Sequence, residues 1–543
     1  MQQKNSTLAP FKNGVFRSLW SATLVSNLGG LIQTVGAGWL MTSLTTSHSM
    51  VGLVQGATTL PVVIFSLIAG ALADNFNRRQ IMLTAQMMMM FVSIILATLT
   101  LMGLINPWLL LIFTFLIGCG SALYNPPWQA TVGDIVPRDE IPAAVTLNSV
   151  GFNLMRSVGP AIGGAIVAAF GGAAAFIFNA FSYIPLIGAL FYWKPVYGIK
   201  NLPRERLVGA MSDGLRYVSM SPNLLNIMLR AFIFGLGAIS ILALLPVVAR
   251  EMLQGGALLY GTLLGCFGIG AIIAGLINSR VRQRFPSELI VKLSFIGFAI
   301  SCLILGLSRS LILTHIILLP AGMFWVLALS LFNVSVQLST PRWVVARALA
   351  LYQTSSFGGM AVGSWLWGAL ADGYSPTIAL YVCSGFLFAG AIMGLKFKIH
   401  EIPAINLDPL DQFREPELSL DLQARSGPIM IMIDYVIKEE DLTEFLKIMT
   451  LRRRIRLRDG ARRWTLLRDL ENPNCWTETY HMPTWVDYLR HNHRRTVADA
   501  EVSEKLNALN NATQDIKVHR MIERQTVPQN DDLHMKHSAH HLH

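Results

Sequence analysis

The chain has 543 residues, of which 53% are hydrophobic and 14% charged, with a mean hydropathy of +0.48 and a formal net charge of +11. Soluble domains carry about one quarter charged residues, so this composition excludes an ordinary soluble protein and indicates a membrane protein. Strand-length segments of alternating hydrophobicity are absent, which excludes a β-barrel. The five cysteines have no paired spacing, so neither a disulfide framework nor a metal site is expected, and no cofactor is predicted.

Twelve apolar stretches follow one another along the first 400 residues. Each approaches or exceeds the roughly 20 residues that a helix needs to cross the hydrocarbon core of a bilayer. The short polar N-terminus has no small-residue cleavage site, so the first stretch is expected to be retained. We predict an all-α membrane part with twelve transmembrane helices, at residues 17–41, 50–73, 80–104, 107–133, 142–170, 173–193, 224–249, 257–278, 289–307, 310–338, 346–371 and 375–397.

The placement of lysine and arginine predicts the orientation. Most of those before residue 400 lie at the N-terminus, in links after even-numbered stretches, or just past the twelfth stretch. Because cytoplasmic links are enriched in these residues, both termini are predicted to be cytoplasmic, in a multi-pass protein of the cell (inner) membrane. Residues 1–400 carry a net +14 and residues 401–543 a net −3. The positive charge is therefore a topology signal and does not indicate a nucleic-acid partner.

A short polar hairpin, Gly-Ala-Leu-Ala-Asp-Asn-Phe-Asn-Arg-Arg, joins the second and third stretches at residues 70–79. Gly70 lets two helix ends approach, Asp74 can accept hydrogen bonds from a helix N-terminus, and Arg78 and Arg79 can anchor to phosphates. The pattern resembles the loop 2–3 signature of the major facilitator superfamily, with Asn75 in place of a usual basic residue and Asn77 in place of the usual glycine. The resemblance implies that these residues form a conformational switch in which Asp74 is a latch.

The longest link, 194–223, divides the stretches into two six-helix halves, 1–193 and 224–398. Its segment 206–220 is expected either as an amphipathic helix on the membrane surface or as a plain linker. The halves echo each other at an offset near 204, and the counterpart of the hairpin, 275–284, has Ser279 where Asp74 lies. Such duplication is expected of transporters whose substrate site lies between two bundles.

The fifth stretch contains Gly159, Pro160, Gly163 and Gly164 in the spacing G-P-x-x-G-G, which resembles a signature of superfamily antiporters. Small residues let helices pack closely, and the proline permits bending. In the same stretch, Arg156 lies about 20 Å along the helix, near mid-bilayer, where a cation is costly unless it is paired or wet. Two roles stay open for it: a cavity-facing charge that attracts an anionic or hydrogen-bonding substrate, or a buried partner for neighbouring amides.

Other polar and aromatic side chains within the stretches are expected to face the bundle interior, where some line a cavity and others tie helices together. No Asp or Glu lies in the middle of a stretch, so a coupling proton would need Asp74, Asp134 or His315. No nucleotide-binding loop is present, which argues against ATP-driven transport. The candidates for the substrate cavity are Arg156, Asn125, Gln129, Asn148, Asn153, Trp128, Gln33 and Asn333.

Together, the twelve stretches resemble the enterobactin-exporter-like branch of the major facilitator superfamily, also called transmembrane secretion effectors. The resemblance covers about 395 residues and rests on the hairpin, on Pro137 and on four further segments, 125–130, 147–149, 156–160 and 363–368. It implies a major facilitator fold, alternating access, and export of small amphipathic molecules such as siderophores and drugs, with proton coupling.

After a linker at 399–427, residues 428–525 read as a soluble cytoplasmic domain with the order β, α, β, β, α, β, typical of an α+β ferredoxin-like fold. This domain resembles small antibiotic-biosynthesis monooxygenases, which implies a homodimer. An oxygenase activity would involve Trp464, Trp485, His491 or His493, whereas a dimerisation or regulatory role would use them as packing. An arginine run at 452–463 is typical of a solvated helix end, with contact to anionic lipid as the alternative. The histidine-rich segment 526–543 is predicted to be disordered rather than metal-binding.

We therefore predict a secondary transporter, not an enzyme, that exports small amphipathic molecules and whose partners are its substrate and the lipid bilayer. Two alternatives stay open: a major facilitator importer of an organic solute, and a membrane-tethered enzyme that acts through the C-terminal domain.

Overall fold

The structure is a computed structural model that describes residues 9–137, 140–194, 207–341, 343–399, 407, 410, 413–510 and 517–523. The contacts between residues divide the chain into two compact units. The first contains the described residues of 1–207, 223–336 and 349–401, and the second those of 208–222, 337–348 and 402–543. The predicted segment 526–543 lies outside the described residues, as do residues 195–206 of the predicted link between the halves.

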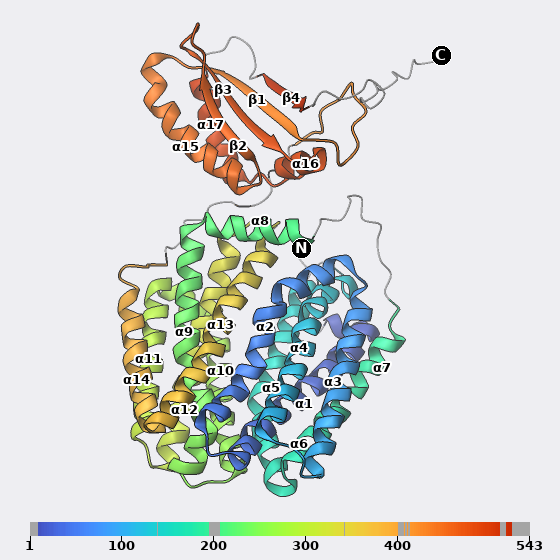
Figure 1. The fold of residues 1–543 in the computed structure, drawn as a ribbon, viewed down its shortest axis with the longest axis vertical. Coiled ribbons are helices and arrows are strands. Elements are labelled where there is room, and N and C mark those ends of the chain that lie inside the picture. Colours follow the sequence, from blue (N-terminus) through green and yellow to red (C-terminus); the bar gives the residue numbers. More distant parts are fainter. Residues whose placement is uncertain are drawn as a thin grey trace. The chain divides into compact units, whose positions relative to one another are not determined.

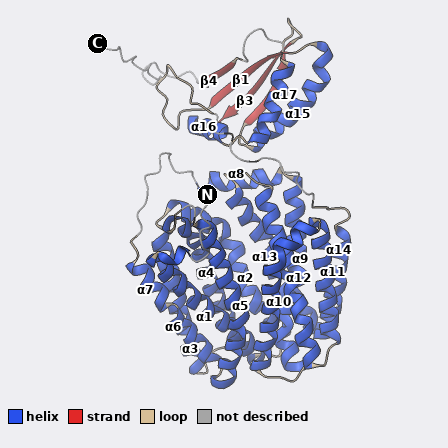
Figure 2. Cartoon of the chain, turned by 180° about the vertical axis from the view of Figure 1, so that it is seen from behind, coloured by secondary structure: helices blue, strands red, loops and turns tan. Residues whose placement is uncertain are grey.

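The first unit is helical (Figures 1 and 2). Its N-terminal half contains η1 (Ala9–Lys12), α1 (Gly14–Leu44), α2 (His48–Asn75), α3 (Arg78–Leu101), α4 (Pro107–Ile135), α5 (Ile141–Phe170), α6 (Gly172–Ser182) and α7 (Ile184–Tyr192). Its C-terminal half contains α9 (Pro222–Val247), the π-helical turn η2 (Val248–Met252), α10 (Ala257–Arg284), α11 (Ser287–Leu307), α12 (Leu311–Leu338), α13 (Val345–Gly373) and α14 (Pro376–Met393).

Short polar residues fix where several of these helices begin. The side chains of Asn13, Ser47, Asn77, Asn106 and Ser375 accept hydrogen bonds from backbone N–H groups in the first turns of α1, α2, α3, α4 and α14. Each side chain replaces a backbone partner that a first turn lacks. The capping residues alternate with long apolar runs, so the sequence itself sets the helical hairpins.

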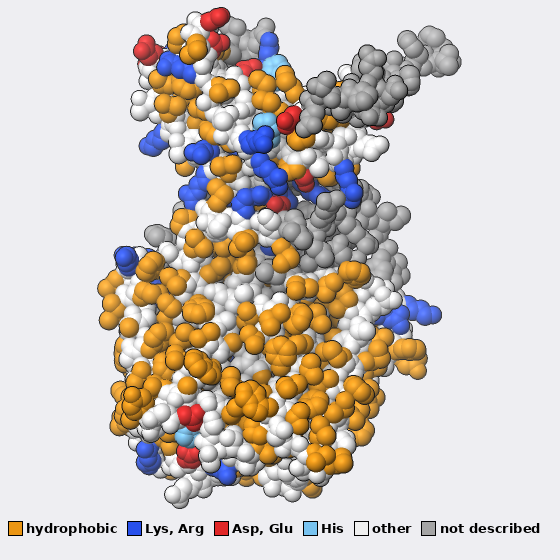
Figure 3. Space-filling model, in the orientation of Figure 1, with side chains coloured by type: hydrophobic (Ala, Val, Ile, Leu, Met, Phe, Trp, Pro, Cys, Tyr) orange, Lys and Arg blue, Asp and Glu red, His pale blue; other side chains and the backbone are white. Residues whose placement is uncertain are grey.

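Ten helical segments of the described chain are long and apolar enough to cross a membrane. They account for ten of the twelve predicted spans, and α6 and α7 together form one of them. The remaining two, α1 and α13, have 31 and 29 residues and are long enough to cross. Their serine, threonine and glycine residues make them less apolar, so the count of twelve stays a prediction for these two helices. Figure 3 shows a largely hydrophobic surface on the helical unit, as contact with lipid requires.

The described part of the C-terminal region forms an antiparallel sheet with the order β2-β3-β1-β4. Its elements are β1 (Ile429–Val436), η3 (Glu439–Asp441), α15 (Leu442–Arg458), β2 (Arg462–Arg468), β3 (Cys475–Met482), α16 (Trp485–His493), α17 (Val497–Leu509) and β4 (Val518–Ile522). Alternate residues of β1, from Ile429 to Tyr435, are buried and pack with Phe445, Met449 and Leu506 of the helices. The other residues of β1 are partly exposed on the opposite face of the sheet.

The second helix of this domain differs from the expected single helix. It is divided into α16 and α17, because Thr496 and Asp499 form a reciprocal capping box that starts a new helix at Val497. The strands predicted at 429–437, 463–470, 476–481 and 516–523 agree with β1 to β4 to within two residues. The helix predicted at 439–456 begins three residues later, after the turn η3, and ends two residues later.

The link between the halves contains a helix, α8 (Leu207–Ser219), and this helix belongs to the second unit. Asp213 of α8 accepts a hydrogen bond from Arg494 at 2.8 Å, and the Arg458 guanidinium lies 5.3 Å from the Tyr217 ring centre. Arg494 also stacks on Trp343, at 4.2 Å, in the segment 337–348. Of the two expectations for this segment, a helix is therefore observed, and its partners are groups of the C-terminal domain.

Candidate substrate site

Arg156, the charge predicted near mid-bilayer, lies on α5 where the two halves meet. Its guanidinium carbon is 6.0 Å from the ring centre of Trp325, on α12 of the opposite half. The side chain is partly exposed, and among the described residues it makes no hydrogen bond or ion pair. A guanidinium without an acceptor, beside an aromatic ring, favours a charge available to a ligand over a buried partner of neighbouring amides.

The ring beside Arg156 is held by an aromatic cluster of the C-terminal half. Trp325 is 4% exposed and contacts Phe267 of α10 edge-on and Phe298 of α11, with ring centres 5.9 and 6.3 Å apart. Because the cluster joins three helices, it fixes the Trp325 ring in place. Only the fold brings this ring to Arg156, because the two residues lie on helices of different halves.

The other polar candidates separate into exposed and buried groups. Asn125 and Gln129 are exposed on α4, and Asn148 on α5 and Asn333 on α12 are partly buried. The side chain of Asn153 lies outside the described part of the chain. Asn125 and Gln129 therefore remain candidates for the substrate cavity.

Gln33 and Trp128 lie inside the N-terminal half. Gln33 is 4% exposed and accepts hydrogen bonds from Asn179 and from Ser93, the latter at 3.2 Å. Trp128 is buried and stacks on Tyr124, with ring centres 6.4 Å apart. These contacts tie α1, α3 and α6 together and hold Trp128 within α4, which favours a structural role for both residues.

The glycines of the G-P-x-x-G-G segment lie against two neighbouring helices. A Cβ atom on Gly159 or Gly163 would meet Leu31 or Ile32 of α1 at 2.9 or 3.0 Å. On Gly164 it would meet the backbone of Gly261, on α10 of the other half, at 2.8 Å. The segment therefore lets α5 and α10 approach to backbone contact across the interface between the halves.

A second close crossing between the halves joins α2 and α13. A Cβ atom on Gly368 would lie 2.6 Å from the Cα atom of Ser49, and one on Gly52 would overlap the Ser364 carbonyl oxygen. Asp372, at the end of α13, caps the start of α2 and accepts from the Ser49 N–H at 2.9 Å and the Ser47 hydroxyl at 2.9 Å. The two crossings lie at the end of the unit where odd-numbered spans finish.

The predicted switch hairpin is tighter than expected. Helix α2 continues to Asn75, so only two residues separate it from α3, and Asn77 caps α3 with an extended backbone at φ −67°. The position needs no positive φ, which explains why asparagine can replace the usual glycine. Arg79 donates to the carbonyl oxygens of Leu190 and Phe191 at the end of α7, both at 2.7 Å.

The other switch residues are less fully described. Arg78 is partly buried and has an interaction partner. The structure does not describe the surroundings of Gly70 and Asp74. An open groove of about 330 Å³ lies at the counterpart segment on α10. It is lined by Gly275, Asn278, Ser279, Arg282 and Gln283.

Sequence reasoning missed a buried ion pair in the C-terminal half. Arg230 lies within the predicted stretch 224–249, eight residues inside α9, and is fully buried. It donates to Glu288 at 2.5 Å, and Glu288 also accepts from the Ile399 N–H at 3.0 Å. The only available signal was a lone arginine in an apolar stretch, which is costly without a partner.

In the C-terminal domain, the residues named for an oxygenase are engaged in packing and internal bonds. Trp464 donates to Glu478 at 3.0 Å, and Trp485 stacks on Tyr488 with ring centres 5.0 Å apart. The His493 ring lies edge-on to Phe413, at 5.2 Å. Among the described residues, no group of three or more histidine, cysteine or acidic side chains is placed to hold a metal ion.

Glu478 is the centre of a buried network in this domain. It is fully buried on β3 and accepts from Arg452 at 2.9 Å, Arg456 at 3.3 Å and the Tyr435 hydroxyl at 3.0 Å. Burial opposes its charge, but Arg456 and Arg452 lower the pKa of Glu478 to about 2. Part of the arginine run thus points inward, and the expected solvated helix end is wrong for these two residues.

His491 adjoins this network. It is buried, and its Nε2 lies 2.9 Å from Arg456, so it accepts from that guanidinium, while Nδ1 faces the Asp459 carbonyl oxygen at 3.3 Å. Burial, and then the positive charge of Arg456, lower the pKa of His491 well below its usual range. This histidine is therefore neutral, and its two ring nitrogens are both engaged.

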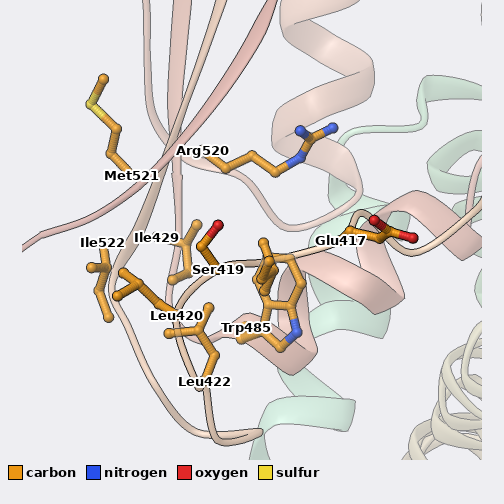
Figure 4. Close-up of a pocket in the computed structure, with 10 residues that line it drawn as sticks. Glu417, Ser419, Leu420, Leu422, Ile429, Trp485, Arg520, Met521 and Ile522 are labelled. Atoms are coloured by element: carbon orange, nitrogen blue, oxygen red, sulfur yellow. The ribbon is translucent and has the colours of Figure 1, made fainter. Parts of the chain in front are cut away.

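A groove of about 240 Å³ lies at the β4 edge of the domain (Figure 4). Trp485, Leu422 and Arg520 line it, together with Ile429, Met521, Ile522 and residues 417–420. Trp464, His491 and His493 do not line it. Of the residues named for an oxygenase, Trp485 is therefore the one that lines this groove.

Comparison with known proteins identifies the family. A sequence model of the transmembrane secretion effectors, a class of major facilitator (MFS) transporters, matches residues 5–527. The chain belongs to this family. Secretion effectors of this class are transmembrane transporters, and the match extends through the C-terminal domain.

Curated relatives at low identity are transporters. The staphyloferrin A transporter of Staphylococcus aureus is 25% identical over 393 residues, which cover 70% of this chain and 97% of the relative. The enterobactin exporter EntS of Escherichia coli O1:K1 is 25% identical, with 68% of this chain and 88% of the relative covered. The macrolide efflux protein A of Streptococcus pyogenes is 21% identical, with 54% and 77% covered.

Solved structures share the fold. The nucleoside transporter NupG superposes with a TM-score of 0.56 at 11% identity and covers 71% of this chain and 100% of its own. An inward-facing, occupied bacterial homologue of the human lysosomal transporter Spinster has a TM-score of 0.57 at 14% identity and covers 72% and 97%. The helical unit of this family member therefore has the major facilitator fold.

Proposed function

We propose that this secretion effector is a secondary active exporter of small amphipathic molecules of the siderophore or drug class. The observation that carries the proposal is the Arg156 guanidinium, unpaired among the described residues, beside Trp325 at the interface between the halves. A cation and an indole ring together suit a ligand with an anionic group and an apolar or aromatic body. The relatives that carry staphyloferrin A, enterobactin and macrolides support this class of substrate.

We propose that export proceeds by alternating access between the two halves. The close crossings of α5 with α10 and α2 with α13 lie at one end, where odd-numbered spans finish. With cytoplasmic termini, as the positive-inside rule favours, this end is the extracytoplasmic one. We infer that the structure represents the state of the carrier that is closed on the outside.

We propose proton coupling as the energy source. The G-P-x-x-G-G segment at the interface between the halves supports this proposal. The acidic residues of the helical unit add no support, because they lie near helix ends. The carrier of the coupling proton is left to experiment, with Asp74, Asp134 and His315 as the candidates.

For the C-terminal domain, we propose a ferredoxin-like dimerisation and regulatory module. The element order and the antiparallel sheet order β2-β3-β1-β4 support the fold. One sheet face is packed against the helices, and the other carries Met430, Met432 and Met521, at least partly exposed, which a second copy would cover. Met432→Glu should then lower the oligomer mass in detergent, measured by light scattering. An unchanged mass that is already monomeric in the wild type would contradict the dimer.

The proposed export is tested in inverted membrane vesicles with a panel of siderophores and drugs and an imposed pH gradient, acidic inside. We expect gradient-dependent uptake of at least one compound, and loss of uptake in Arg156→Ala. Arg280→Ala, which removes an exposed arginine of the same unit, is the matched control and should transport normally. Uptake that ignores the gradient would remove proton coupling, and full transport by Arg156→Ala would remove the proposed substrate site.

A further inference from the structure

His48, at the first position of α2, lies between two carboxylates of the opposite half. Its Nε2 is 3.0 and 3.1 Å from the two carboxylate oxygens of Glu251, in the turn η2. Its Nδ1 is 3.4 Å from Oδ1 of Asp372, at the end of α13. Both ring nitrogens therefore face negatively charged groups across the interface between the halves.

This geometry distinguishes the two forms of the imidazole. A neutral ring has one N–H and one lone pair, so one of its nitrogens would face a carboxylate with lone pair against lone pair. The imidazolium has a positive charge that attracts both carboxylates. Its Nε2 donates to Glu251, and its Nδ1, which makes no hydrogen bond, lies within ion-pair distance of Asp372. The contact between the halves is thus stronger when His48 is protonated.

The other groups around His48 do not replace this proton. Arg250, next to Glu251, donates instead to the Thr42 carbonyl oxygen at the end of α1. Ser47 and Ser49 are neutral, and they and the backbone N–H of His48 bond to Asp372. The charged groups that the described structure places at the His48 ring are therefore Glu251 and Asp372, which together carry two negative charges.

The site is open to water while the halves are in contact. The His48 side chain is 17% exposed and that of Glu251 is 48% exposed, so a proton can reach the ring without separation of the halves. His48 also stays at this end of α2 in any state of the carrier. A proton bound here is released to the same side, so the site senses protons without carrying them across.

We propose that His48, Glu251 and Asp372 form an outer latch that protonation tightens, so that acid outside the cell shifts the carrier toward its outside-closed state. The inference rests on the orientation and alternating access proposed above. It assigns to the latch a control of conformation by external pH, separate from the coupling proton. Two partly exposed ion pairs correspond to a shift of about threefold to tenfold in the ratio of closed to open carriers between the neutral and the protonated form of His48.

The test measures conformation without substrate or gradient. Spin labels replace the exposed residues Leu104 and Ser310, on links of the two halves at the latch end, and distances are measured for the full chain in lipid nanodiscs. We expect the short-distance population of the wild type to grow as the pH falls. His48→Gln should abolish this response, and His48→Lys should favour the short distance at every pH. His519→Gln changes a half-exposed histidine of the C-terminal domain, outside the helical unit, and should keep the wild-type response.

A pH response that survives in His48→Gln, or a wild type that does not respond to pH, would overturn the latch. The outcome is independent of the export assay, because the nanodisc has no gradient and contains no substrate. Failure of export with a responsive latch would therefore refute the proposed function alone, and export with a silent latch would refute this inference alone.

Discussion

Gly261, on α10, is the position where the contact between the halves is most sharply testable. A Cβ atom there would lie 2.6 Å from the Pro160 carbonyl oxygen and 2.7 Å from the Cα atom of Gly164. Both are backbone atoms of α5, so no side-chain rotation can relieve the overlap. Gly261→Ala therefore forces the two helices apart wherever they cross this closely.

The same helix offers a matched control one turn away. A Cβ atom on Gly265 would lie 3.6 Å from the Ser157 carbonyl oxygen and 3.7 Å from the Ala161 side chain, which is ordinary contact. Both substitutions give the helix the same gain in intrinsic propensity, about 1 kcal/mol. The difference between the two variants thus isolates the overlap with α5.

Overpacking of this kind costs about 1–3 kcal/mol. The overlap exists only while α5 and α10 are in contact, so the cost falls on the outside-closed state. It corresponds to roughly a 5- to 150-fold shift of the closed–open equilibrium toward the open state. We expect Gly261→Ala to slow export for this reason, and Gly265→Ala to transport at close to the wild-type rate.

Distance measurements between Leu104 and Ser310 in nanodiscs report the equilibrium, and vesicle uptake reports transport. The same distance distribution in Gly261→Ala and Gly265→Ala would show that the overlap with α5 does not shift the equilibrium. A larger closed population in Gly261→Ala would contradict the expected direction of the shift. Thermal unfolding of both purified variants checks that the comparison is made between folded proteins.

Three further predictions concern charged and titrating groups. Arg156→Lys should retain part of the export that Arg156→Ala loses, because the ammonium keeps the charge without the planar donor array; equal loss in both, measured by vesicle uptake, would point to a structural role. Glu478→Gln should destabilise the C-terminal domain by about 3–5 kcal/mol at pH 7, since it leaves two buried arginines unpaired; tryptophan fluorescence during denaturation reports this, and an unchanged midpoint would contradict it. The free energy of unfolding of this domain should be greatest above pH 6.5 and fall as the pH drops toward 5, because His491 binds a proton more readily in the unfolded chain than in the folded domain. His491→Gln should make this pH dependence weaker. An equally steep decline in the variant would exclude His491 as its source.

Local sequence alone determined the helical class, most of the helix boundaries and the order of elements in the C-terminal domain. Long apolar runs must form helices in lipid, because every backbone polar group then bonds within its own segment. Short polar residues between the runs cap the next helix, as Asn77 does after the hairpin. These signals are local, so a single sequence contains them in full.

Tertiary structure decided which charges meet. His48 lies hundreds of residues from Glu251 and Asp372, and Arg156 meets Trp325 only because α5 packs against the opposite half. The local sequence around an isolated arginine or histidine does not distinguish a side chain that is buried against a carboxylate from one that is available to a ligand. The difference depends on which helices pack together, and that is fixed by side-chain shape and close glycine crossings between segments distant in the chain.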